Sequence, residues 1–296
     1  MSRSFDRLVE EVRRGVEAEL DRLLGPVEEA GDLAPLHAAM RHAVLGGGKR
    51  VRALLVDLAG RALDVPEPAR RRVGAAVELL HAYSLVHDDL PAMDDASLRR
   101  GLPTVHRRFG EDVAILAGDA LQALAFEVLA RADWPASAPA RAALVAELAA
   151  AAGWRGMCGG QFLDLHPAGS DETEVVRLQR LKTGALIAFC VRAPAILAQA
   201  PAPVREALER YADALGLAFQ ITDDLLDVEG TAATTGKDTG RDVPAGKATL
   251  VALFGVEGAR RRLRDLAREA EEALAVVPAD ATWLRELFRR VCERTS

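Results

Sequence analysis

Two aspartate clusters, one in each half of the chain, constrain its fold and chemistry more than any other feature. Residues 88–95 contain four aspartates and residues 223–227 contain three. Each cluster follows a stretch whose composition indicates a buried helix. Carboxylates at the ends of buried helices repel one another and lose hydration unless cations lie between them. The two clusters therefore predict a site that binds hard metal ions.

The rest of the sequence favours packed helices. Half of the 296 residues are hydrophobic but only 4% are aromatic, and no run alternates Val, Ile or Thr with the period of a strand. Breaks rich in Gly and Pro leave about ten helical segments. No long linker divides the chain. We therefore expect an all-α fold, a helical bundle in which residues 1–296 form a single domain.

Charge and cysteine content exclude several classes of protein. The formal net charge is -6, and basic residues are dispersed, so a nucleic-acid partner is not expected. Cys158, Cys190 and Cys292 are widely spaced and include no Cys-x-x-Cys pair, which argues against a disulfide framework or a zinc site. A reduced, cytoplasmic setting fits this pattern.

Neither apolar stretch of note predicts membrane insertion. Residues 1–24 contain six acidic residues among apolar ones, which indicates an amphipathic helix and not a signal peptide. The most apolar window, residues 184–200, is interrupted by Arg192 and Pro194 and is short for a bilayer, which needs about 20 apolar residues. We expect this window to form a core helix, and no stable membrane insertion.

The second aspartate cluster has helical spacing. Gln220, Asp223 and Asp227 are spaced i, i+3 and i+7, so they share one helix face. A solvated acidic helix end would look the same, but the apolar residues before the cluster favour a buried helix and a metal site. Residues 229–246 contain four glycines and follow directly, as a loop that covers phosphate would.

The first aspartate cluster combines a helix end with a bend. His81, Ser84 and Asp88 share a helix face, whereas Pro91 prevents a regular helix from continuing to Asp94. Mg²⁺ prefers a few carboxylates together with phosphate oxygens and water. The candidate Mg²⁺ ligands here are Asp88, Asp89 and Asp94. An alternative is a di-iron site, because Glu78 and His81 form a Glu-x-x-His pair, but the second copy that such sites use is missing.

Basic residues near both clusters are spaced to hold phosphate. Three glycines precede Lys49 and open a helix, so backbone N–H groups, Lys49 and Arg52 can converge on an anion. The loop lacks the Gly-Lys-Ser/Thr ending of a P-loop. Arg50 points about a third of a turn away, so a surface ion pair and a ligand contact remain equally open for it.

Further basic residues are candidates of the same kind. Arg99 and Arg100 follow the first cluster and can each grip a phosphate in a bidentate fork, although a solvated pair is the alternative. Lys182 lies in an apolar helix, where an unpaired lysine would be costly. Lys237 and Lys247 lie in and after the segment 229–246 and by themselves resemble surface lysines. Together the clusters suggest a Mg²⁺-dependent enzyme that acts on diphosphates.

Taken together, these residues resemble those of the trans-isoprenyl diphosphate synthases, and most closely those of the bacterial farnesyl diphosphate synthases. The resemblance extends from about residue 39 to residue 247 and is most specific in residues 81–94 and 98–101. It implies a helical bundle with a central cavity and usually a homodimer. It also implies Mg²⁺-dependent condensation of isopentenyl diphosphate with dimethylallyl or geranyl diphosphate to make farnesyl diphosphate.

The resemblance assigns roles to individual residues. The Mg²⁺ ligands would be Asp88, Asp89, Asp94, Asp223, Asp224 and Asp227, with roughly three ions per site. The cations for the allylic diphosphate would be Arg99, Lys182, Lys237 and Lys247. The isopentenyl diphosphate site would contain Lys49, Arg52, His81 and Arg100. Thr183 and Gln220 would face the developing allylic cation, and Asp164 matches a further acidic position.

Product length is expected to depend on Tyr83. This residue lies one and a half turns before Asp88, roughly 7.5 Å along a helix at about 1.5 Å per residue, so its ring can close an apolar channel. An aromatic here, followed by Pro91 and Ala92, resembles producers of the farnesyl chain. The alternatives are that Tyr83 only packs in the core, that the product is geranylgeranyl diphosphate, or that the chain is a non-catalytic partner subunit.

Overall fold

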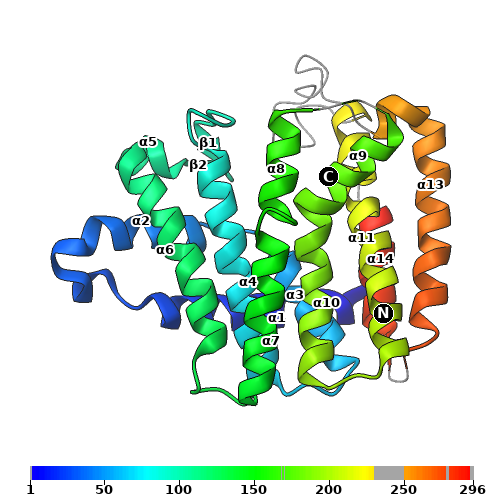
Figure 1. Ribbon diagram of the computed structural model, residues 1–296, viewed down its shortest axis with the longest axis horizontal. Helices are drawn as coiled ribbons and strands as arrows, with labels where there is room; N and C mark the ends of the chain where they lie inside the picture. Colours follow the sequence, from blue (N-terminus) through cyan, green and yellow to red (C-terminus); the bar gives the residue numbers. More distant parts are fainter. Residues whose placement is uncertain (1, 168, 170, 230–249, 278–279, 294–296) are drawn as a thin grey trace. The chain divides into compact units, whose positions relative to one another are not determined.

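The protein is described by a computed structural model that covers residues 2–167, 169, 171–229, 250–277 and 280–293 (Figure 1). Helices make up nearly all of the regular structure in these residues. The described strands are β1 (Leu98–Arg99) and β2 (Leu102–Pro103), an antiparallel pair in which Leu98 faces Pro103. The predicted all-α class is confirmed.

The chain divides into two compact units, Met1–Ala149 with Ile196–Ala198, and Ala150–Ala195 with Gln199–Ser296. Unit 1 contains β1, β2, α1 (Ser2–Leu24), η1 (Val27–Leu33), α2 (Ala34–Leu45), α3 (Val51–Arg61), α4 (Glu67–Asp88), α5 (Val105–Phe109), α6 (Glu111–Ala130) and most of α7 (Ala138–Ala152). Unit 2 contains α8 (Met157–Leu165), α9 (Glu172–Gln179), η2 (Arg180–Gly184), most of α10 (Ala185–Leu197), α11 (Ala202–Glu229), α13 (Leu250–Leu274) and α14 (Thr282–Cys292).

Helix α4 is the centre of unit 1. It begins after Pro66 and has Pro68 in its first turn, where a missing N–H removes no intrahelical hydrogen bond. It ends at Asp88, just before Pro91, which cannot continue a helix. Its apolar positions are buried, and it packs against α1, α3 and α6 (Figure 1). This packing holds the end of α4 in place, and the first aspartate cluster begins there.

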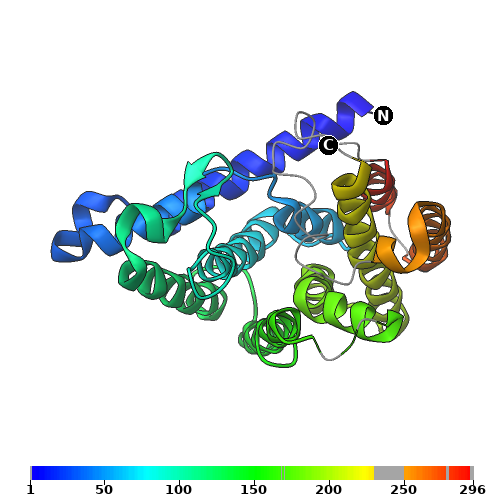
Figure 2. The same cartoon turned by 90° about the horizontal axis from the view of Figure 1, so that it is seen from above.

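Helix α11 is the centre of unit 2, as α4 is of unit 1. It packs along α13 and also contacts α14 and η2, and Figure 2 shows α11 in yellow beside α13 in orange and α14 in red. Tyr211 is completely buried in this group, and its hydroxyl donates to the carbonyl of Leu284 at 2.8 Å. Burial raises the pKa of Tyr211 far above its usual value. The second aspartate cluster therefore also extends from a buried helix.

The apolar helices of the chain differ in their surroundings. Residues 185–195 of α10 are mostly buried, so the predicted core helix is confirmed, with Pro194 inside it. Among the described helices, α6 alone is long and apolar enough to cross a membrane, judged by length and composition only. It packs against α2, α4 and α5 within unit 1.

Candidate active site

The first aspartate cluster folds back on the end of α4. After Asp88 the chain turns through Pro91, and the N–H of Asp94 donates to the Asp88 carbonyl at 2.9 Å. Asp88 is partly buried and Asp94 is exposed. The bend predicted from Pro91 is confirmed, and it brings Asp94 back toward the residue that ends the helix.

Asp89 has a different environment from its neighbours, because it is buried and paired with Arg99. The Arg99 Nη2 lies 2.7 Å from Oδ1 of Asp89, and its Nε lies 2.8 Å from Oδ2. Burial by itself lowers the pKa of Arg99, but the bond to Asp89 and the charges of Asp88 and Asp94 outweigh it, so the pKa is raised. Asp89 therefore fixes Arg99 beside the cluster. Its predicted role as a Mg²⁺ ligand stays a prediction.

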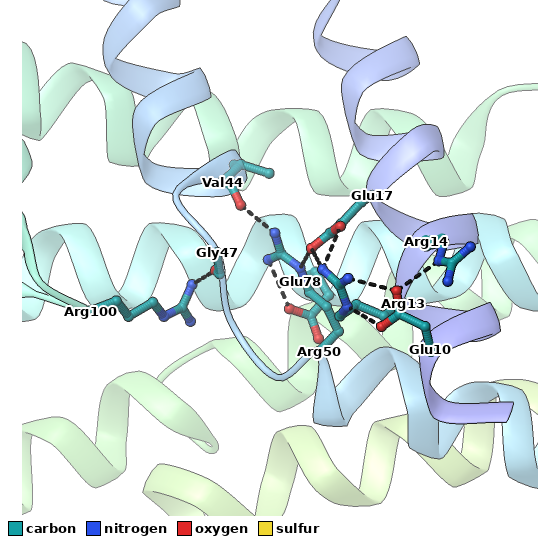
Figure 3. A network of polar contacts seen from close by, with 9 residues as sticks. All are labelled: Glu10, Arg13, Arg14, Glu17, Val44, Gly47, Arg50, Glu78 and Arg100. Carbon is teal, nitrogen blue, oxygen red and sulfur yellow. Dashed lines mark hydrogen bonds and ion pairs between the residues drawn. The ribbon is translucent and has the colours of Figure 1, made fainter. Parts of the chain in front are cut away.

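The hairpin that carries Arg99 sends the next arginine elsewhere. Arg100 has a positive φ of 55°, and its Nη1 donates to the carbonyl of Gly47 (Figure 3). A Cβ at Gly48 would lie 2.6 Å from the same Nη1, so a side chain there would displace the guanidinium. Burial and then the charge of Arg50 lower the pKa of Arg100. Of the two adjacent arginines, Arg99 therefore binds the first aspartate cluster, and Arg100 binds the glycine-rich loop between α2 and α3, residues 46–50.

His81 lies among these cations on α4. Burial first, and then the charges of Arg52, Arg100 and Arg99, hold the pKa of His81 well below its usual value of 6.5. The imidazole is therefore neutral near pH 7 and offers one N–H donor to an anion. Ser84, one turn on, donates its hydroxyl to the His81 carbonyl at 2.9 Å. Tyr83 is partly buried, and its ring meets the His87 ring edge-on with centroids 5.1 Å apart.

The alternative of a surface ion pair for Arg50 is wrong. This residue is only 5% exposed, and its guanidinium lies 3.5 Å from Glu78 and 3.7 Å from Glu17 (Figure 3). The physical reason is that α1 and α4 place the carboxylates of Glu17 and Glu78 beside its guanidinium. Glu78 also accepts the N–H of Ala53, so both of its oxygens have partners other than a metal. The carboxylate of the Glu-x-x-His pair is therefore engaged elsewhere, which argues against the di-iron alternative.

In unit 2, Lys182 is paired with a carboxylate. Its Nζ lies 2.6 Å from Oδ2 of Asp164 on α8. A Cβ at Gly160 would lie 2.1 Å from the Lys182 backbone nitrogen, so glycine is needed for this approach of α8 to η2. The expected α-helix around Lys182 is wrong in detail, because residues 180–184 form a π-helical turn. Such turns are frequent at functional sites.

Thr183 and Gln220 come together as a pair. The Thr183 hydroxyl donates to Oε1 of Gln220 at 3.0 Å, which joins η2 to α11. Both side chains are partly buried. The structure thus brings together two residues, distant in sequence, that were assigned one role, and that role itself stays a prediction.

The second aspartate cluster divides between surface and interior. Asp223 is exposed, whereas Asp224 is buried and its Oδ2 accepts the N–H of Leu250 at 3.0 Å. Leu250 is the first residue of α13, so Asp224 caps that helix, where a negative charge is favourable. The spacing did not reveal this cap. The side chain of Asp227 and the residues Lys237 and Lys247 lie outside the described part of the chain.

In each unit by itself, the aspartate carboxylates are of a kind that fits Mg²⁺ arriving with a phosphate ligand. Among the residues that the structure describes, no three His, Cys, Asp or Glu side chains lie close enough to hold a metal ion by themselves. Asp88 and Asp94 offer hard oxygens at the end of α4, and Asp223 offers one on α11. Mg²⁺ is commonly bound through one or two carboxylates, with phosphate oxygens and water completing the shell.

Comparison with known proteins identifies close relatives over most of the chain. The family model described as "Polyprenyl synthetase" matches residues 34–281. The farnesyl diphosphate synthase of Escherichia coli (strain K12) is 46% identical over 287 residues, which cover 93% of this chain and 94% of the relative. A probable farnesyl diphosphate synthase of Bradyrhizobium diazoefficiens is 47% identical, covering 93% of this chain and 83% of the relative.

Solved structures share the fold. The crystal structure of an FPP/GFPP synthase from Zymomonas mobilis superposes with a TM-score of 0.88 at 40% identity, covering 99% of this chain and 100% of that chain. The similarity therefore extends through both units.

Proposed function

Because this chain belongs to the polyprenyl synthetase family, we propose that it is a trans-prenyltransferase that makes farnesyl diphosphate. It condenses isopentenyl diphosphate with dimethylallyl diphosphate and then with geranyl diphosphate. The observation that carries the proposal is high identity to farnesyl diphosphate synthases over nearly the whole chain, with both aspartate clusters present. The single family match, which includes parts of both units, supports one polyprenyl synthetase domain.

The chemical difficulty is breaking an allylic C–O bond beside a diphosphate. Arg99 and Lys182 are each held by a carboxylate and can stabilise negative charge as it appears on the leaving diphosphate. The oxygens of Thr183 and Gln220 face the positive charge on the allyl group. As the allylic C–O bond breaks, the double bond of isopentenyl diphosphate attacks the allylic carbon and a C–C bond forms. A carbon next to the new cationic centre then loses a proton to the departing diphosphate and a double bond forms, so no protein base is required.

The metal ions and the second substrate use different groups. Mg²⁺ would supply Lewis-acid neutralisation of the leaving diphosphate, at roughly three ions per site. The residues that would hold it are Asp88, Asp89, Asp94, Asp223, Asp224 and Asp227. Isopentenyl diphosphate is bound by Lys49, Arg52, His81 and Arg100. The neutral imidazole of His81 is suited to donate a hydrogen bond without adding repulsion among the arginines. Lys237 and Lys247 complete the set of cations.

The proposal also includes a homodimeric assembly and a cytoplasmic location. A homodimer is supported by α6, which leaves Ile115 45% and Leu116 54% exposed on an otherwise apolar helix. A cytoplasmic location is supported by three widely spaced cysteines without a disulfide pattern. Light scattering coupled to size exclusion measures the assembly directly, and a monomer at micromolar concentration would contradict the dimer.

One incubation tests the activity. The purified protein is mixed with isopentenyl diphosphate, dimethylallyl diphosphate and Mg²⁺, and the dephosphorylated products are sized by chromatography. Farnesol is the expected product, and its formation should stop when EDTA removes Mg²⁺. Geranylgeraniol as the main product would favour the longer-chain alternative. Turnover that appears only after a homologous synthase is added would favour a partner subunit.

A further inference from the structure

Arg50 occupies an unusual position at the end of the glycine-rich loop. It directly precedes α3 and is almost completely buried, whereas its neighbour Lys49 is exposed. Its φ of 49° lies in the left-handed region, which costs free energy for any residue with a Cβ. Such a backbone persists only where the surrounding contacts hold it. The side chain of Arg50 provides those contacts.

The guanidinium of Arg50 links three helices. Its Nη2 donates to the Val44 carbonyl in the last turn of α2 at 2.6 Å, and its Nη1 lies 3.5 Å from Oε2 of Glu78 on α4. Its Nε lies 3.7 Å from Oε1 of Glu17 on α1. Figure 3 shows Arg50 at the centre of this network, with Arg100 reaching the same loop through Gly47.

Glu78 extends the link to the start of α3. Its Oε1 accepts the N–H of Ala53 at 3.2 Å, one of the first-turn donors that have no partner within the helix. Arg50 and Glu78 together therefore tie down both ends of the loop, at Val44 before it and at Ala53 after it. Lys49 and Arg52 lie between these two anchors in sequence, so their positions depend on the pair.

We infer that Arg50, through Glu78, is a positioning residue that orients Lys49 and Arg52 for isopentenyl diphosphate. Its side chain contacts Val44, Glu78 and Glu17, and its proposed effect on the substrate is indirect. This inference rests on the proposed function, since it refines the isopentenyl diphosphate site. A buried ion pair is a poor source of stability compared with apolar packing. Its geometric effect on the loop explains its presence in this place.

The test compares variants by their steady-state constants for each substrate. Arg50→Met combined with Glu78→Gln removes both charges of the pair, so position 78 carries no unpaired carboxylate. The amide oxygen introduced at position 78 can still accept the N–H of Ala53. We expect the KM for isopentenyl diphosphate to rise about ten-fold or more, because a displaced site binds its ligand poorly. The KM for the allylic diphosphate should stay within about two-fold. The single variant Arg50→Lys, which keeps the charge, should show a smaller rise.

A matched control is available in the same network. Arg13 pairs with Glu17 and Glu10, and all three residues lie on α1. Arg13→Met should therefore leave both KM values unchanged. A folded double variant with a normal KM for isopentenyl diphosphate would overturn the inference, as would an equal rise in both KM values. If the double variant does not fold, Glu78→Gln and Arg50→Lys are assessed singly by the same criteria.

The proposed function and the positioning role fail separately. Wild-type protein without prenyl transfer would reject the proposed function. Calorimetric binding of isopentenyl diphosphate to wild-type and variant protein would then assess the role of Arg50 directly. Equal affinities would reject the positioning role.

Discussion

The two units hold their candidate ligand-binding residues in place by different means. In unit 1, long side chains hold the loop before α3: Arg50 bonds to the carbonyl of Val44, and Arg100 bonds to the carbonyl of Gly47. A loop has no core of its own, so its geometry depends on such anchors.

In unit 2, the candidate groups lie on helical turns. Lys182 pairs with Asp164, and Thr183 pairs with Gln220, across helices that already pack together. Their positions follow from the hydrophobic core. We therefore expect substitutions of residues outside the proposed ligand contacts to affect binding more in unit 1 than in unit 2.

The largest expected effect concerns what the units share. Asp88→Ala in unit 1 and Asp223→Ala in unit 2 should each lower kcat about a thousand-fold, because each removes negative charge that holds Mg²⁺ on the leaving group. Helicity by circular dichroism should not change. Asp265→Ala serves as the control, since this side chain on α13 is 48% exposed and pairs with Arg268. Near-normal rates in both aspartate variants would reject the shared role.

Product length should depend on unit 1 alone. Tyr83→Ala removes a partly buried ring from the last turns of α4, and we expect products to shift toward geranylgeranyl diphosphate or longer chains. The chain has one other tyrosine, Tyr211, in the core of unit 2. Tyr211→Phe should leave product length unchanged. An unchanged product profile in Tyr83→Ala would show that this ring does not close the channel.

Adjacent aspartates in unit 2 should differ in their effect on stability. Asp224→Ala removes the cap of α13 and should cost about 1 kcal/mol of the free energy of unfolding, measured without Mg²⁺ or substrates. Asp223→Ala removes an exposed group and should leave the melting temperature unchanged. Equal melting temperatures for the two variants would contradict the cap.

The last expected effect concerns pH and unit 1. The pKa of His81 is depressed in the folded state, so the unfolded chain binds the proton more tightly. Stability should therefore fall as pH decreases below 6.5, by at most about 1.4 kcal/mol per pH unit from this group. His81→Gln should show a shallower decline in melting temperature between about pH 6.5 and pH 5. Identical slopes would mean that His81 is not held neutral.

Much of the site could be predicted from local patterns. Pro91 required the bend that returns Asp94 to Asp88, and helical spacing placed Gln220 and Asp223 on one turn of α11. These outcomes depend on the covalent geometry of proline and on the helical repeat. Both act over a few residues, so the order of residues is sufficient to reveal them.

Other features depend on partners far along the chain. The roles of Asp224 and Lys182 required Leu250 and Asp164, and no periodicity links either pair. The π-helical turn at residues 180–184 likewise lies against α8 and α11, and no local pattern indicated it.

Composition, spacing and proline act locally, so the helical class, the two aspartate clusters and the set of candidate cations could be read from the order of residues. How the charged side chains pair with one another depended on the packing of the helices. Arg50 shows the reason most clearly: its burial depends on Glu17 and Glu78, and only the packing of α1 and α4 around the loop brings those carboxylates to it.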